Sequence, residues 1–148
     1  MKISTKGRYG LRIMVDIALH ESDGPVTLHE IAERQSISEK YLWQVINVLK
    51  SAGLVRVTRG ARGGYQLARP SSEITLYDIV VPLEGTFELV DCVYSKNHCV
   101  RSEQCAARDV WRNLSEEIER LFRSITLETV VSLARKRQKE VNAITFEI

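Results

Sequence analysis

An apolar stripe between residues 38 and 53 places the strongest constraint on the fold of this chain. Its members follow the spacing i, i+3, i+4, i+7, which predicts a helix with one buried face. Ser38 is a suitable N-cap for this helix, and Gly53 marks its end. Other elements must cover the stripe, because a lone helix of this length is not stable in water. The stripe consists of Leu42, Val45, Ile46 and Leu49.

Two further helices are predicted ahead of this one. Ser4 is a suitable N-cap for the first, which extends to about His20. Thr27 and Glu30 have the spacing of a capping box, which predicts the start of a short second helix. Only the tight connection at 35–37 separates the second helix from the third. Two helices joined so closely are typical of a helix-turn-helix.

A glycine-rich turn follows the third helix. Residues 54–58 and 65–67 have strand-like patterns, and the glycines between them suit a turn that needs positive φ or close backbone approach. This pattern predicts a β-hairpin, which would be the wing of a winged helix-turn-helix. The segment 54–69 contains four arginines and no acidic residue, which favours contact with a phosphate backbone or a minor groove. The arginines are Arg56, Arg59, Arg62 and Arg69.

The face of the third helix opposite the stripe carries side chains that suit DNA. Gln44 and Asn47 can donate and accept hydrogen bonds at base edges, and Lys40 suits a phosphate or a guanine. A solvated polar face, or a wing that binds RNA or protein, is the alternative, but the two motifs together favour double-stranded DNA. The predicted DNA-binding residues are Lys2, Ser38, Lys40, Tyr41, Trp43, Gln44, Asn47, Arg56, Arg59, Arg62, Gly63 and Tyr65.

The distribution of charge also favours a polyanionic partner. Residues 1–70 carry a net charge of +5, whereas residues 71–148 carry −3. Pro70 suggests a boundary, so we predict a DNA-binding domain over 1–70 and a second part over 71–148. The chain lacks the run of roughly 18 apolar residues that a membrane span needs, and its start does not resemble a signal peptide. We therefore expect a cytoplasmic protein without a membrane partner.

A long helix is predicted over about 106–124, followed by another over about 126–140. Apolar residues in the first recur at alternating steps of three and four, which is a heptad seam. Such a seam must be buried on its own chain or against a second copy. A homodimer on a palindromic operator is favoured, since helix-turn-helix proteins gain affinity by reading two half-sites. The seam consists of Trp111, Leu114, Ile118, Leu121 and Ile125.

All three cysteines lie in one polar loop, at about 91–106. An odd count in a cytosolic chain fits a disulfide framework poorly, whereas thiolates suit a soft metal or an iron–sulfur cluster. Zinc, with His98 as a possible fourth ligand, and thiol oxidation are the alternatives. An enzyme is not expected, because the chain has no Cys-x-x-Cys pair, phosphate-binding loop or acid–base constellation. The cysteines are Cys92, Cys99 and Cys105.

Three stretches of the sequence resemble the Rrf2 family of winged helix-turn-helix transcription regulators. They are the start at 1–9, the helix-turn-helix at 31–42 and the wing at 57–65. The resemblance covers nearly the whole chain and extends to the IscR-like branch of the family. It implies a dimeric regulator that holds a 2Fe–2S cluster on the three cysteines.

The same resemblance raises the question of the fourth ligand. The IscR-like branch has a histidine three residues after the last cysteine, where this chain has Arg108, which stays protonated and cannot bind iron. His98 and Asp109 are the candidates instead. We therefore predict a mainly α fold with a small β-hairpin wing and a long C-terminal dimerisation helix. Its function would be a cluster-sensing regulator, most simply a repressor; the alternative is one that senses thiol oxidation or zinc, or acts through a partner protein.

Overall fold

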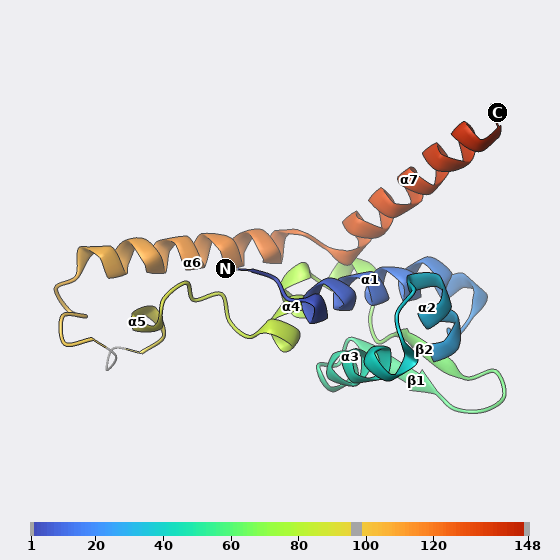
Figure 1. The fold of residues 1–148 in the computed structure, drawn as a ribbon, viewed down its shortest axis with the longest axis horizontal. Helices are drawn as coiled ribbons and strands as arrows, with labels where there is room; N and C mark the ends of the chain where they lie inside the picture. The colour runs from blue at the N-terminus through green and yellow to red at the C-terminus, as the bar shows by residue number, and fades with distance from the viewer. Residues whose placement is uncertain (1, 96–98, 147–148) are drawn as a thin grey trace.

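The fold of the chain, seen in a computed structural model that describes residues 2–95 and 99–146, is mostly helical with one small hairpin (Figure 1). The expected fold class is therefore confirmed. In chain order the elements are α1 (Thr5–His20), η1 (Glu21–Asp23), α2 (Leu28–Gln35), α3 (Glu39–Ser51), β1 (Val55–Thr58), β2 (Gly64–Leu67), η2 (Ser71–Glu73), α4 (Leu76–Glu84), α5 (Asp91–Tyr94), α6 (Ala106–Ser124) and α7 (Leu127–Phe146).

The first three helices begin at the predicted caps. The side chain of Ser4 accepts hydrogen bonds from the first turn of α1, and that of Ser38 accepts one from the first turn of α3. Thr27 and Glu30 form the capping box at the start of α2, with both reciprocal hydrogen bonds present. The turn between α2 and α3 closes through Ser36, which adopts a left-handed conformation with φ of 53°.

One apolar core joins the helices at both ends of the chain. The predicted stripe of α3 is fully buried against α1, whose Ile13 and Ile17 are also inaccessible to solvent. Ile79 of α4 and Leu127 of α7 belong to the same cluster. The core thus continues past residue 70, and the domain boundary expected there stays a prediction.

The wing is an antiparallel pair of strands that is tied to the helices. β1 and β2 pair with Val55 opposite Leu67. Val26 extends the hairpin, because its N–H donates to the Tyr65 carbonyl at 2.9 Å and its carbonyl accepts from Tyr65 at 2.7 Å. Gly63 is required by the turn itself, since a Cβ there would lie 2.3 Å from the carbonyl oxygen of Thr58.

The two long helices extend away from this body (Figure 1). The cysteine loop lies at the far end of α6, and α7 projects from the opposite end of that helix. α7 is anchored by Leu127 and Val131, which are buried, whereas Val141 further along is 62% exposed. Over the described part of the chain, no helix is both long and apolar enough to cross a membrane.

Candidate DNA interface and cysteine loop

The outer face of α3 presents side chains that are predicted to contact DNA. Lys40 and Gln44 are exposed, and Trp43 is 56% exposed despite its large apolar ring. Asn47 is half-buried on the same helix. Ser38 is exposed, but its hydroxyl already accepts a hydrogen bond from the Tyr41 N–H at 3.4 Å. This face is therefore free to meet a partner.

All four arginines of the segment 54–69 are exposed. Arg56, Arg59 and Arg62 are exposed on the hairpin. Arg69 differs, because its guanidinium lies 3.1 Å from the carboxylate of Asp78 in α4. Arg69 thus links the end of the wing to α4. The other three arginines lie on the hairpin itself.

A buried polar network fixes the turn of the helix-turn-helix. Asp16 of α1 is only 2% exposed, and its carboxylate accepts from Arg34 at 2.8 Å and from the Gln35 amide at 2.8 Å. Arg12 adds a hydrogen bond to the Gln35 carbonyl at 2.5 Å. The hydrogen bond with Asp16 raises the pKa of Arg34 above its usual value. No member of this network is among the predicted site residues.

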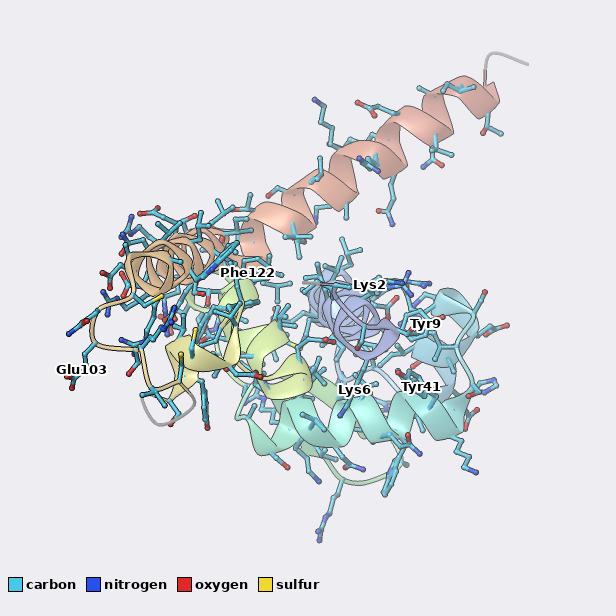
Figure 2. The ribbon with its side chains drawn as sticks, turned by 60° about the vertical axis from the view of Figure 1, so that its left-hand side comes forward. Lys2, Lys6, Tyr9, Tyr41, Glu103 and Phe122 are labelled. Carbon is cyan, nitrogen blue, oxygen red and sulfur yellow. The ribbon has the colours of Figure 1, made fainter. Side chains whose placement is uncertain are left out.

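The second turn of α1 lies beside the first turn of α3. The ring of Tyr9 meets the ring of Tyr41 edge-on, with centroids 5.7 Å apart. Figure 2 shows Lys6 on the side of α1 that faces α3, whereas Lys2 lies on the other side of α1. Lys2 is exposed and Lys6 half-buried. The positive charge of Lys6 is therefore next to the predicted reading helix.

The three cysteines lie on one segment between α4 and α6. Cys92 is in α5, Cys99 is exposed, and Cys105 is the N-cap residue of α6; all three are free thiols. Among residues 2–95 and 99–146, no three side chains of the His, Cys, Asp or Glu type are gathered as a ready metal site. The candidate ligand His98 lies outside the described residues.

Arg108 joins the two ends of this loop. Its side chain is buried, and its Nε donates to the carbonyl oxygen of Cys92 at 2.6 Å. Its backbone N–H donates to the carbonyl of Cys105 at 3.1 Å. The other candidate ligand, Asp109, is exposed and paired with Arg112. The donor set that fits iron–sulfur chemistry is therefore the three sulfurs, while the candidate carboxylate is already engaged.

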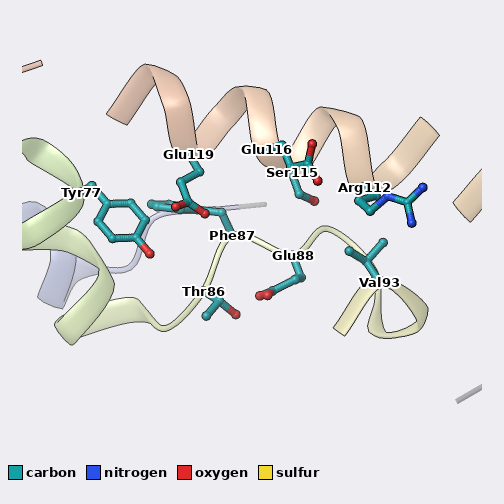
Figure 3. A pocket seen from close by; sticks show the side chains of 9 residues that line it. All are labelled: Tyr77, Thr86, Phe87, Glu88, Val93, Arg112, Ser115, Glu116 and Glu119. Carbon is teal, nitrogen blue, oxygen red and sulfur yellow. The ribbon is translucent and has the colours of Figure 1, made fainter. Parts of the chain in front are cut away.

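The connection from α4 to the cysteines is packed against α6. Phe87 is buried, and its ring lies 4.4 Å from that of Phe122 between centroids. The N–H of Leu89 donates to the hydroxyl of Ser115 at 3.2 Å. A cavity of about 360 Å³ opens beside this contact (Figure 3). Its lining residues are Tyr77, Thr86, Phe87, Glu88, Val93, Arg112, Ser115, Glu116 and Glu119.

A helix-turn-helix followed by a basic hairpin defines this chain as a winged helix-turn-helix transcription regulator rather than an enzyme. The sequence model of the Rrf2 family, described as an iron-dependent transcriptional regulator, matches residues 3–133, and the chain belongs to this family. It is 40% identical over 135 residues to Protein rrf2 of Nitratidesulfovibrio vulgaris, an alignment that covers 91% of this chain and 88% of that protein.

The comparison with solved structures agrees with the family assignment. The fold is similar to T. potens IscR, with a TM-score of 0.74 and 41% identity over 93% of this chain and 91% of that one. It is equally similar to CymR, the global cysteine regulator of B. subtilis, with a TM-score of 0.76 and 39% identity over 90% and 98% of the two chains. Regulation is thus common to the family description and to CymR, but the first names iron and the second names cysteine.

Proposed function

We propose that this protein is a homodimeric regulator that reads a palindromic operator in the cytoplasm and senses iron–sulfur cluster status through the loop 91–106. The observation that carries the sensing role is the placement of all three free thiols on one segment, outside the apolar core. The family description as iron-dependent and the similarity to an IscR support this choice. Repression is the simplest mode of regulation, since a bound dimer covers the operator DNA and keeps other proteins from it.

Cys92, Cys99 and Cys105 would hold the cluster. When bound, it would supply a centre whose presence depends on oxygen and on the availability of iron. Arg108 contributes by tying the backbone of Cys92 to the start of α6, so that two of the thiols keep a fixed spacing. Its positive charge also favours anionic sulfur nearby. The fourth ligand is proposed to come from His98.

The absorbance spectrum of protein purified without oxygen tests the cluster. We expect visible bands together with iron and sulfide, and we expect Cys99→Ser to lose them. Ser102→Ala, a change in the same loop, is the matched control and should keep the bands. Wild-type protein without visible bands or iron under these conditions would contradict the iron–sulfur proposal.

Thiol oxidation or zinc is the second candidate, and one observation favours thiol oxidation. Cys99 is exposed and Cys92 and Cys105 are half-buried, so an oxidant can reach the thiols of this loop. A thiol sensor would be colourless and would change its DNA affinity reversibly with oxidant and reductant. A zinc sensor would be colourless and hold zinc in proportion to protein.

Gln44 is proposed to read a base edge. We expect Gln44→Ala to weaken binding to the operator by about 1–3 kcal/mol, the usual value of a bidentate base contact. Binding to random DNA should change little, because that binding depends on phosphate contacts. Titration of both DNAs with wild type and variant gives the comparison. Equal losses on both would remove Gln44 from the base-reading set.

Arg59 and Arg62 are proposed to contact phosphates or a minor groove. Replacing either with alanine should weaken binding to all sequences and lower the slope of log affinity against log salt by about one. Arg135→Ala, which removes an equal charge from exposed α7, is the control and should leave the slope nearly unchanged. An unchanged slope in the wing variants would show that the wing does not touch DNA.

A further inference from the structure

We propose that Glu84 is a positioning residue for DNA binding, which holds the basic start of α1 beside the reading helix α3. Glu84 is the last residue of α4, far from α1 in the sequence. Its carboxylate reaches the N-terminus of α1 and completes the cap that Ser4 begins. The residue does not contact the predicted DNA surface itself, so its effect would be exerted through α1.

Three hydrogen bonds define this contact. Oε1 of Glu84 accepts from the Gly7 N–H at 2.8 Å and from the Ser4 hydroxyl at 2.5 Å. Oε2 accepts from the Ser4 N–H at 3.2 Å. N–H groups in the first turn of a helix lack partners within the helix, and a negative charge there is favourable. The carboxylate therefore satisfies the end of α1 from outside that helix.

The charge of Glu84 is retained in this position. Burial by itself raises the pKa of the carboxylate. The hydrogen bonds from Ser4 and Gly7 together lower the pKa by more than burial raises it, so that it lies below its ordinary value. The group is therefore ionised at neutral pH, and the contact is a charge-assisted one.

Two glycines allow α4 to come this close. A Cβ on Gly7 would lie 2.5 Å from Oε1 of Glu84, and one on Gly10 would lie 2.1 Å from Cδ1 of Leu83. Both glycines are inside α1, where each costs about 1 kcal/mol relative to alanine. They lie one turn apart on the face that meets α4, so the sequence accommodates the approach of Glu84 at some cost in helix stability.

The contact fixes the part of α1 that carries positive charge toward α3. Lys2 precedes the cap, and Lys6 donates its backbone N–H to the Ser4 hydroxyl at 3.1 Å. Lys6 and Tyr9 share one face of the helix, and Tyr9 meets Tyr41 in the first turn of α3 (Figure 2). Fraying of the first turn of α1 would release Lys6 from its place beside the reading helix, and Lys2 would move with the segment that precedes the cap.

Glu84 also lies at the point where the chain leaves α4 and continues toward the cysteines. A role for Glu84 in signalling rests on the proposed function. Gly85 ends α4, and Phe87 then docks on α6 before the chain enters α5 with Cys92. A rearrangement of the cysteine loop would therefore displace Glu84, the residue that caps α1.

The sign of the effect on DNA affinity separates positioning from simple charge. Removing an acidic residue from a DNA-binding protein strengthens binding if only its charge matters. We expect the opposite for Glu84→Ala: about tenfold weaker binding to operator DNA, with a salt slope lower by about one or two, as lysine–phosphate contacts are lost. Glu88→Ala removes the same charge from the exposed neighbouring segment and should bind as wild type or tighter. Binding by Glu84→Ala that equals or exceeds wild type would overturn the proposal.

A double-mutant cycle excludes a general loss of structure. In a chain carrying Lys2→Ala and Lys6→Ala, Glu84→Ala should cause no further loss of affinity, because the groups that it positions are absent. A second tenfold loss in that background would show a global defect and would also overturn the proposal. Glu84→Gln, which keeps one acceptor oxygen for Gly7 and Ser4, should bind with intermediate affinity.

Comparison of cluster-loaded and cluster-free protein tests the link to the cysteines. We expect the ratio of their DNA affinities to approach one in Glu84→Ala, and a ratio unchanged from wild type would contradict the linking role. A wild-type ratio of one would count against the proposed sensing function instead. In that case the affinity of Glu84→Ala still decides whether Glu84 positions α1.

Discussion

Replacing Asp16 with alanine is expected to lower the free energy of unfolding by about 3–5 kcal/mol, the usual loss when one partner of a buried ion pair is removed. Asp16 is almost fully buried, and its carboxylate receives the Arg34 guanidinium and the Gln35 amide. The value should fall at the lower end, because Arg34 is 31% exposed and can partly rehydrate.

Urea denaturation followed by circular dichroism gives the comparison. Glu21→Ala, which removes an exposed carboxylate close to the end of α1, is the matched control and should change stability by less than about 0.5 kcal/mol. A double-mutant cycle with Arg34→Met should recover part of the loss, since the unpaired guanidinium is then gone. An Asp16→Ala variant as stable as the control would show that the network does not stabilise the fold.

The same variant should affect DNA binding through the turn between α2 and α3. Gln35 is the last residue of α2, and its side chain and carbonyl are both held from α1. Without Asp16 the angle between the two helices of the motif is less well fixed, so operator affinity should fall more than affinity for random DNA. The two affinities should differ because contacts to base edges need a defined geometry, whereas contacts to phosphates do not read the sequence.

Most of the fold could be predicted because its signals are local. Caps, apolar spacing and glycine turns are determined within a few residues, and α1, α2, α3 and the wing appear where these signals place them. α5 was not expected, since it is a single turn inside the cysteine loop with no side-chain cap. The helix predicted to end at about 140 extends to Phe146, because no breaker follows.

The residues that the sequence did not reveal depend on contacts between distant segments. Asp16 interrupts the buried face of α1 that includes Ile13 and Ile17, and an acid at such a position is a usable signal for a buried ion pair. Glu84 gives no such signal, since a glutamate at a helix end is ordinary. Arg69 was grouped with the wing by composition, and only the position of Asp78 in space assigns it to α4.

The apolar seam of α6 gives the second large expected effect. Trp111, Leu114 and Leu121 are 41%, 44% and 58% exposed, so this part of the predicted seam is not covered by the described residues of its own chain. Ile118 and Ile125 are half-buried. A long helix with an exposed apolar stripe is expected to pair with another copy, which would also set the spacing of two reading helices.

Leu114→Asp combined with Leu121→Asp should therefore give a folded monomer. Both side chains are exposed in the single chain, so the change leaves the core intact, whereas it would bury four carboxylates in the dimer. Each would cost several kcal/mol, which raises the dimer dissociation constant by more than about a thousandfold. Asn113→Asp, off the seam on the same helix, is the control and should remain dimeric in sedimentation.

The DNA affinity of this monomer decides what the dimer contributes. A single protomer can occupy only one half-site, so the variant should lose the gain from joining two half-sites, which amounts to a factor of about 10²–10⁴. Its binding to an isolated half-site should match that of wild type, because α3 and the wing are unchanged. A wild-type protein that sediments as a monomer, or a seam variant that stays dimeric, would show that the exposed stripe of α6 does not form the interface.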